Sequence, residues 1–581
     1  MKFSVLALDY DGTIAREGVL DPEVKAAVAE VRAQGITVVI VSGRVLADLE
    51  QAAGGLGFVD AVVAENGAVL SFPNGHSRLL GQPPPNVFLA ELGRRGIAFS
   101  SGQCVIEADA SSAQAILAVI RELELPLVLL FNCSRLMVLP QSISKATGLR
   151  AVLTALRLSA HNAIGIGDAE NDHDLLMACE VGVAVSWGSR ALQAVADEVL
   201  QGDGPSAVAA YIRKEAGGKG RLPLDSLHRH SIPVGTTMDG QMVWLPIRGY
   251  NGLVTGGPQS GKSWATGLVC EQLILQGYCV WVVDPEGDYG TLEGLPGVVV
   301  MAGKPTPPAP AELGRALRYP DISVVVDLSH VPYQEKREYL DSLLPMLALN
   351  RRSTGLPHHI VIDEAHYFLH DPRVFQLLDL DLGAYTLVTY RSSDLDPALR
   401  KAIDVVVTTR VTDSQSLDAI LAMWGGPNAN AQFKEVIEDL TIDEAAILPG
   451  PVTGGKLLTI KLLPRLTRHV RHRVKYFDVS VGEGRGFVFT SNGNAVGAPA
   501  RSLREFLSAL SNLPPGVLEG HAKRGDFSRW FSDVLGDHAL SSRVRKVEEE
   551  YRLGHIRDLA PPLAALIRER YDLPSKLIVP G

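Results

Sequence analysis

Two carboxylates stand two residues apart directly after the first apolar run of the chain. The run at residues 3–8 is strand-like and leads into the sequence DYDGT, which contains Asp9 and Asp11. Two acids at the end of a buried strand are costly unless a cation or a reaction uses them. The carboxyl ends of strands are also where open α/β sheets bind ligands. Because an acid after a strand can instead cap the next helix, a capping role stays open for this pair alone.

Three further segments carry side chains suited to phosphoryl transfer. A strand-like run at 39–41 leads into Ser42, Lys145 begins a helix-like run, and residues 165–172 read GIGDAEND with Asp168 and Asp172. A carboxylate can attack phosphorus, a second acid can protonate the leaving oxygen, and hydroxyl and ammonium groups can hold phosphoryl oxygens. A cation offsets the accumulated negative charge. These types in this order predict a metal-dependent phosphoryl-transfer site.

The motifs DxDGT, SGR, Lys and GDxxND resemble those of the haloacid dehalogenase superfamily over residues 1 to about 213. The sequence ENGA at 65–68 is similar to the subgroup that contains the Cof-type and sucrose-phosphate phosphatases. The resemblance implies a small cap domain at about 76–140, entered through the Pro-rich segment 82–86, that selects the substrate by covering the site. It leaves the substrate itself open.

Site roles follow from the same resemblance, residue by residue. Asp9 would be the nucleophile that forms an aspartyl-phosphate, and Asp11 the general acid/base. Ser42 and Lys145 would hold the phosphoryl group. Magnesium would be bound by Asp9, the backbone carbonyl of Asp11 and Asp168, with support from Asp172.

A second phosphate-binding motif lies near the middle of the chain. Residues 256–263 read GGPQSGKS, which fits G-x-x-x-x-G-K-[ST] between a strand-like run and an apolar helix. Backbone N–H groups of such a loop cradle phosphates at a helix N-terminus, the lysine reaches the β- and γ-phosphates, and the serine holds magnesium. The predicted nucleotide-binding residues are Gly256, Gly257, Pro258, Gln259, Ser260, Gly261, Lys262 and Ser263.

An acidic strand end follows the loop at residues 359–366, HIVIDEAH. Asp363 suits a magnesium shell and Glu364 could activate the attacking water. A capped helix is the alternative, but the pairing with a phosphate loop argues against it. The sequences VGT at 234–236, VDPEGDY at 283–289 and TYR at 389–391 resemble the HerA/FtsK-like branch of motor ATPases. Tyr390 departs from the glutamine usual there. The resemblance implies a ring, most often a hexamer, that translocates DNA, with an arginine from a neighbour completing the site; Arg391 and Arg410 are candidates.

The alternation of short β-branched runs with helical stretches predicts an α/β fold class. We expect a Rossmann-like haloacid dehalogenase domain with a small α+β cap at 1–213, a linker at 214–227, a P-loop α/β domain at 228–464 and a small α+β module at 465–581. Strands are predicted at 38–41, 61–64, 163–166, 252–255, 280–283, 323–326, 360–362 and 386–389. A helix is predicted from Pro22, capped by Asp21 and ended near Gly35.

Composition narrows the class of protein further. The chain has 581 residues, 46% hydrophobic, and a net charge of −10, which argues against nucleic-acid attraction by the whole surface. A basic run at 465–475 could contact phosphates, but a face that meets acidic residues elsewhere is the favoured interpretation. The cysteines are Cys104, Cys133, Cys179, Cys270 and Cys279, with no C-x-x-C pair, as expected for reduced thiols in a cytoplasmic protein. No run resembles a signal peptide or a membrane span.

The leading hypothesis is a magnesium-dependent phosphatase coupled to an ATP-hydrolysing domain in a homo-oligomer. One alternative is a nucleic-acid end-processing enzyme, in which a P-loop kinase adds a 5′-phosphate and the phosphatase removes a 3′-phosphate. The acid pair at 363–364 argues against transfer to a hydroxyl. A third hypothesis is a ring-forming scaffold or defence module controlled by nucleotide. The expected substrate is a phosphorylated small molecule or a nucleic-acid end.

Overall fold

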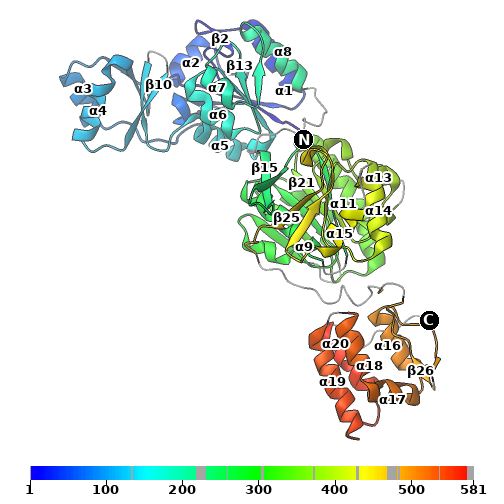
Figure 1. Cartoon of the computed structure of the whole chain (residues 1–581). Helices are drawn as coiled ribbons and strands as arrows, with labels where there is room; N and C mark the ends of the chain where they lie inside the picture. The colour runs from blue at the N-terminus through cyan, green and yellow to red at the C-terminus, as the bar shows by residue number, and fades with distance from the viewer. Residues whose placement is uncertain are drawn as a thin grey trace.

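The structure, a computed structural model, describes residues 2–132, 135–216, 230–257, 260–302, 306–370, 373–426, 431–467, 481, 484–491, 493–535 and 537–571. Within these ranges no helix is both long and apolar enough to cross a membrane. An N-terminal α/β domain with a cap, a second α/β domain and a C-terminal group of helices follow one another along the chain (Figure 1).

An eight-stranded sheet forms the centre of the N-terminal domain, in the order β14-β13-β12-β1-β4-β5-β6-β7. Strand β1 pairs in parallel with β12 on one side and β4 on the other, so the carboxyl ends of all three meet at one edge. The strands are β1 (Val5–Leu8), β4 (Thr37–Val41), β5 (Ala61–Ala64), β6 (Val69–Ser71), β7 (Ser77–Leu79), β12 (Ala163–Gly167), β13 (Val181–Val185) and β14 (Glu198–Leu200), with a small hairpin β2 (Ala15–Arg16) and β3 (Val19–Leu20). The helices are α1 (Pro22–Ala33), α2 (Leu46–Ala52), α5 (Lys145–Leu156), α6 (His173–Ala178), α7 (Arg190–Val195) and α8 (Pro205–Ala216).

Helix α1 forms where the sequence predicts it. Asp21 accepts a hydrogen bond from the Glu23 amide at 2.8 Å, and such a cap stabilises a helix by about 1 kcal/mol. The buried positions Val24, Ala27, Val28 and Val31 lie on one face and pack into the domain core. Helix α8 runs to Ala216, so the first residues of the predicted linker are helical, and the rest of that linker lies outside the described residues.

The cap is a four-stranded antiparallel sheet in the order β10-β11-β9-β8, with two helices on one face (Figure 1). On one face of the cap sheet, Ile106, Leu136 and Val138 pack against the cap helices. On the other face, Met137 and Leu139, the alternate residues of β11, belong to the hydrophobic cluster of the main sheet. The second face of the cap sheet therefore lies against the N-terminal domain. The elements are α3 (Asn86–Arg94), β8 (Phe99–Ser101), β9 (Ile106–Asp109), α4 (Ala113–Glu122), β10 (Leu127–Asn132) and β11 (Arg135–Pro140).

The second α/β domain contains an eleven-stranded sheet in the order β16-β15-β25-β24-β23-β17-β22-β21-β18-β20-β19. Side chains of β18 alternate between two clusters, Trp281 and Val283 on one face and Val280 and Val282 on the other, as expected for a parallel strand buried on both faces. The strands are β15 (Ser231–Thr236), β16 (Met242–Pro246), β17 (Asn251–Thr255), β18 (Val280–Asp284), β19 (Val298–Ala302), β20 (Ser323–Asp327), β21 (His359–Ile362), β22 (Tyr385–Thr389), β23 (Val405–Thr408), β24 (Glu444–Ile447) and β25 (Leu458–Leu462). The helices are α9 (Lys262–Leu275), α10 (Pro310–Ala316), α11 (Tyr333–Thr354), α12 (Val374–Leu377), α13 (Pro397–Lys401), α14 (Ser414–Trp424) and α15 (Ala431–Asp439).

A buried polar junction connects the two α/β domains. The Glu180 carboxylate, in a residue only 2% exposed, accepts the Tyr278 hydroxyl at 2.9 Å and lies 2.9 Å from His161 Nδ1. Arg248 donates to the Glu180 backbone oxygen at 2.9 Å. Tyr278 precedes β18 and His161 precedes β12, so the junction joins the amino ends of strands, opposite the edges where the predicted sites lie.

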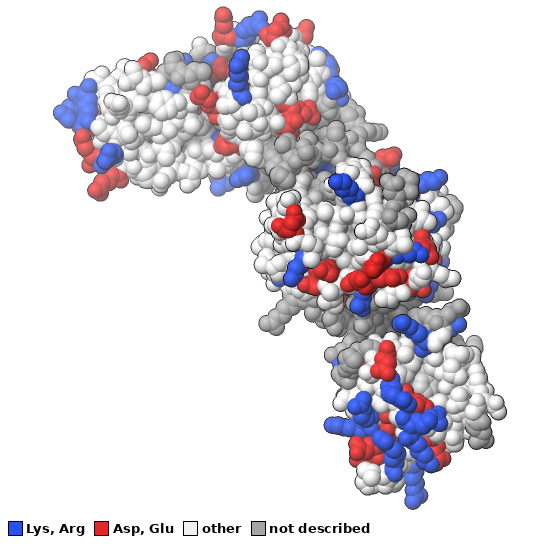
Figure 2. Space-filling view, viewed as in Figure 1, with Lys and Arg blue, Asp and Glu red and all other residues white. Residues whose placement is uncertain are grey.

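The C-terminal region, predicted as a small α+β module, is mainly helical in its described residues, with one short β hairpin. Aromatic side chains, among them Phe506, Phe527 and Trp530, form its core. Lysines and arginines crowd its surface in Figure 2, but ion pairs tie several of them to acids, for example Arg529 to Asp526. The elements are β26 (Thr490–Ser491), β27 (Asn494–Ala495), α16 (Leu503–Asn512), α17 (Pro515–Arg524), α18 (Asp526–Asp533), α19 (His538–Arg552) and α20 (Ala560–Arg570).

The basic run at 465–475 falls mostly outside the described residues. Its first member, Arg465, is buried and donates to Glu271 Oε1 at 2.8 Å. At this one position the basic side chain pairs with an acid of the same chain, which agrees with the favoured interpretation of the basic run and not with a phosphate contact.

Candidate active sites

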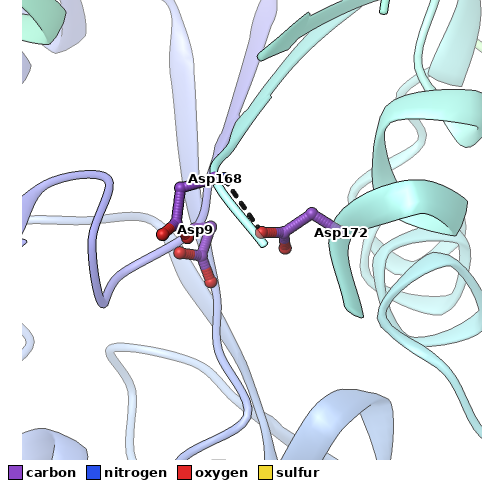
Figure 3. Close-up of side chains that lie close together, drawn as sticks. All are labelled: Asp9, Asp168 and Asp172. Carbon is purple, nitrogen blue, oxygen red and sulfur yellow. Dashed lines mark hydrogen bonds between the residues drawn. The ribbon is translucent and has the colours of Figure 1, made fainter. Parts of the chain in front are cut away.

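Three carboxylates meet at the carboxyl edge of the first sheet. Asp9 directly follows β1, Asp168 directly follows β12, and Asp172 lies in the turn before α6; their nearest oxygen atoms all lie within 4.8 Å of one another (Figure 3). Asp172 Oδ2 accepts the backbone N–H of Asp168 and of Ala169, both at 3.1 Å. These two bonds fix the turn and leave the other Asp172 oxygen, Oδ1, for the ammonium group of Lys145.

A buried ammonium group lies between two of these acids. Lys145 Nζ donates to Asp9 Oδ1 at 2.6 Å and to Asp172 Oδ1 at 2.5 Å, and the residue is 1% exposed. Ser144 caps helix α5 by accepting the Thr147 amide, which places Lys145 at the first helical position. One ammonium against three carboxylates leaves two negative charges, so the oxygen donors and the net charge both fit a divalent cation.

Burial and mutual repulsion perturb the acids of this site. Burial, followed by the neighbouring Asp172 carboxylate, raises the pKa of Asp9 well above its usual value, although Lys145 opposes the shift. The same two causes raise the pKa of Asp168 to about 7. A bound cation would favour the ionised forms of both groups.

The remaining phosphate-holding residue predicted from sequence also lies at this edge. Ser42 follows β4, is buried, and its Oγ accepts the Arg44 amide at 3.2 Å. Gly12 has a φ of +76°, and a Cβ there would lie 2.1 Å from Asp168 Oδ2, so only glycine allows the turn to approach the acid so closely.

The side chain of Asp11 does not join the three acids. Arg44 holds it through two bonds of 2.6 Å, from Nε to Oδ2 and from Nη2 to Oδ1. The Asp11 side chain is 45% exposed, at the open side of the site. This position suits proton exchange with a leaving group better than metal ligation by the carboxylate, and it leaves only the backbone carbonyl of Asp11 as a candidate metal ligand.

Two residues that sequence reasoning did not assign connect the cap to this site. The fully buried Glu65 carboxylate accepts the backbone amides of Gln103, Cys104 and Val105 at 2.7–3.1 Å. Met137 of the cap lies over Gly43, where a Cβ would be 2.8 Å from the Met137 Cε. Glu65 therefore fastens the cap, and Met137 brings the cap against the turn that follows Ser42.

Comparison with known proteins agrees with this geometry. The model of the family described as haloacid dehalogenase-like hydrolase matches residues 6–79 and 101–212. The N-terminal domain is a haloacid dehalogenase-like hydrolase. It is 25% identical over 225 residues to a phosphoglycolate phosphatase of Methanopyrus kandleri, an alignment that covers 36% of this chain and 96% of that protein. A phosphoglycolate phosphatase of Methanosarcina acetivorans is 26% identical, with 38% and 99% covered.

Solved structures also align with the hydrolase domain. A haloacid dehalogenase-like hydrolase from Bacteroides thetaiotaomicron covers 37% of this chain and 99% of its own length, with 16% identity and a TM-score of 0.34.

The predicted phosphate loop of the second domain curls around its own lysine. Lys262 Nζ donates to the carbonyl oxygens of Gly256 at 3.1 Å and Gly257 at 2.6 Å. A Cβ on Gly256 would lie 2.1 Å from Thr409 Oγ1, and Gly261, with φ +103°, is the N-cap residue of helix α9. Ser260 Oγ donates to the Gly257 carbonyl at 2.7 Å. Pro258 and Gln259 lie outside the described residues.

The predicted acidic pair lies near the loop, at the end of β21. One strand, β22, separates β21 from β17, whose end begins the loop. Both acids are 1% exposed; Asp363 Oδ1 accepts the Glu364 amide at 2.9 Å, and Glu364 adopts φ +46° with Oε2 3.6 Å from His366 Nδ1. The serine of the loop has a different acidic partner: Ser263 Oγ donates to Asp288 Oδ2 at 2.8 Å. Sequence reasoning gave Asp288 no role.

The ring of Tyr390 lies beside the predicted phosphate loop. Lys262 Nζ lies 5.9 Å from the centroid of the Tyr390 ring, and the His366 ring packs edge-on against it at 4.7 Å. Arg391 covers the same ring at 5.2 Å and is exposed. The Arg410 carbonyl accepts the Gly257 amide at 2.9 Å while its side chain is exposed, so both candidate arginines lie beside the loop of their own chain.

Proposed function

We propose that the hydrolase domain cleaves phosphomonoesters through an aspartyl-phosphate on Asp9. The observation that carries this proposal is the convergence of three carboxylates, Asp9, Asp168 and Asp172, around the buried ammonium group of Lys145. The phosphatase names of the aligned relatives support it.

In the first step an Asp9 carboxylate oxygen bonds to phosphorus while the bond from phosphorus to the leaving oxygen breaks. Asp11 gives that oxygen its proton, and the Lys145 ammonium and Ser42 hydroxyl hold phosphoryl oxygens. Magnesium, bound by Asp9, Asp168 and the Asp11 carbonyl with Asp172 in support, would supply charge neutralisation.

In the second step water attacks the phosphorus of the aspartyl-phosphate, and Asp11 takes a proton from that water. The bond from phosphorus to Asp9 breaks, which releases inorganic phosphate and restores the carboxylate. In the structure Arg44 orients the Asp11 carboxylate at the open side of the site through two bonds.

The docked cap favours a small substrate. Met137 lies directly over Gly43 and Glu65 ties the cap in place, so a bulky leaving group would have to displace the cap. A side-by-side assay with phosphoglycolate, sugar phosphates and 3′- or 5′-phosphorylated oligonucleotides tests this. Small esters should be hydrolysed at least about tenfold faster than oligonucleotide ends, a difference of about 1.4 kcal/mol in barrier. Faster hydrolysis of oligonucleotide ends would favour an end-processing enzyme.

We propose in addition that the second domain binds and hydrolyses ATP. The supporting observation is a loop wound around Lys262 at the end of β17 with two buried acids one strand away, at the end of β21. Nucleotide phosphates would replace the two carbonyl partners of Lys262, Ser263 and Asp363 would hold magnesium, and Glu364 would take a proton from the attacking water. Lys262→Ala should abolish measurable binding of a fluorescent ATP analogue; unchanged affinity would refute a nucleotide site here.

A further inference from the structure

The loop after β18 is built around one buried acid. Asp284 ends the strand, is fully buried, and accepts the backbone amides of Gly287, Asp288 and Tyr289 at 2.7–3.0 Å. Burial, then the neighbouring Asp288 carboxylate, raises the pKa of Asp284 to about 7. Three hydrogen bonds to one carboxylate hold the loop in a single conformation, although burial and the neighbouring acid disfavour the charge of that carboxylate.

A second anchor fixes the start of the same loop. Lys336 of α11 reaches under it and donates from Nζ to the Pro285 carbonyl at 2.6 Å. The loop is thus held at its first residue by Lys336 and at its last three by Asp284. A short segment held at both ends can present one side chain at a defined position.

The side chain presented is Asp288. It is 4% exposed, and its Oδ2 accepts the hydroxyl proton of Ser263, the residue that follows the loop lysine, at 2.8 Å. A serine hydroxyl has one proton and two lone-pair positions. When the proton is donated to Asp288, the lone pairs are left to face a cation beside the phosphates.

The geometry points to Asp288 as a positioning residue of the magnesium site in the second domain: it orients the Ser263 hydroxyl as a metal ligand. This inference rests on the proposed nucleotide function. Asp363, the acid that the sequence assigns to the metal, hydrogen-bonds to the amide of Glu364. The two acids would thus act differently, Asp363 as a direct ligand and Asp288 through the serine. Outer partners of metal ligands commonly contribute 10- to 100-fold in metal affinity.

The test separates binding of the nucleotide from binding of the metal. Affinity for a fluorescent ATP analogue is measured with magnesium and with EDTA, and Mn²⁺ binding to the nucleotide complex is measured by electron paramagnetic resonance. In Asp288→Ala we expect the gain in affinity given by magnesium to fall at least about tenfold, with the affinity in EDTA unchanged. Asp288→Asn keeps an acceptor oxygen and should retain most of the gain.

Matched variants make each outcome decisive. Glu293→Gln removes an exposed acid from the following turn and should behave as wild type. Ser263→Ala should resemble Asp288→Ala, and the double variant should be no worse than either. A wild-type magnesium gain in Asp288→Ala, or equal losses in the Ala and Asn variants, would overturn the inference while the nucleotide site stands. If Lys262→Ala binds the analogue normally, the proposed function itself fails.

Discussion

The two α/β domains hold acids at the carboxyl edge of a parallel sheet by different means. In the hydrolase domain the Lys145 ammonium lies between Asp9 and Asp172. In the second domain the Lys262 ammonium faces carbonyls of its own loop, and Asp288 and Glu364 are held by other groups. The first site thus has its cationic partner in place, whereas the lysine of the second bonds to neutral carbonyls, which nucleotide phosphates would replace in the proposed function. We therefore expect the two sites to act independently of each other, and the variants below test this.

Exchanging the nucleophile should have the largest effect. Asp9→Asn removes the attacking carboxylate, and hydrolysis of an aryl phosphate in magnesium should fall by about 1,000-fold or more. ATP hydrolysis should stay within about twofold of wild type, since the Lys262 loop is in the other domain. Parallel steady-state assays measure both; an equal loss in the two activities would show that the sites are not independent.

Glu364→Gln should lower the activity of the second site and leave that of the first unchanged. The amide cannot accept a proton from water, so ATP turnover should fall by about 10²- to 10⁴-fold while analogue affinity is retained. Phosphatase activity serves as the internal control and should be unchanged. Normal ATP turnover in this variant would place the base elsewhere.

Breaking the junction tests whether the domains are joined as tightly as the contacts indicate. Glu180→Ala leaves the Tyr278 hydroxyl, His161 and Arg248 without a buried acidic partner, which typically costs about 3–5 kcal/mol. Calorimetry should show a lower melting temperature and separated transitions for the two domains. Glu50→Ala, an exposed acid of α2, is the control. An unchanged melting profile in Glu180→Ala would mean that the junction contributes little to stability.

The smallest effect concerns pH and metal in the hydrolase site. Because the pKa of Asp168 rises from 3.8 to about 7 on folding, the contribution of this group to the stability of the metal-free protein should be full below the lower value and be lost as pH rises through the upper one. Magnesium binds the ionised acids and should offset that loss, so the melting temperature should depend less on pH with magnesium than with EDTA. Identical pH profiles would argue against a cation at these acids.

Much of the fold follows from local sequence patterns. The strands containing Val38–Val41, Val280–Val283 and Ile360–Ile362 form where β-branched runs predict them, and the Asp21 cap begins α1 as expected. Those signals lie within a few residues of the element they specify. The described part of the C-terminal region is mainly helical, with the short hairpin β26–β27, while residues 468–480 lie outside the described residues.

The unpredicted parts of both sites depend on contacts between distant segments. Glu65 meets cap amides 38 to 40 residues away, and Ser263 meets Asp288 only because the β18 loop turns back toward α9. A buried glutamate after a strand and a second acid in DPEGDY were visible in the sequence, but periodicity does not reveal where their side chains point.

Trapping the covalent intermediate tests the central claim most directly. Protein mixed with a ³²P-labelled small phosphomonoester in magnesium and quenched in acid should carry label on Asp9, up to one phosphate per chain. The label should be released by hydroxylamine, as an acyl phosphate requires, and should be absent from Asp9→Asn. Wild-type hydrolysis without any acid-stable label, together with full activity in Asp9→Asn, would contradict an aspartyl-phosphate at this site.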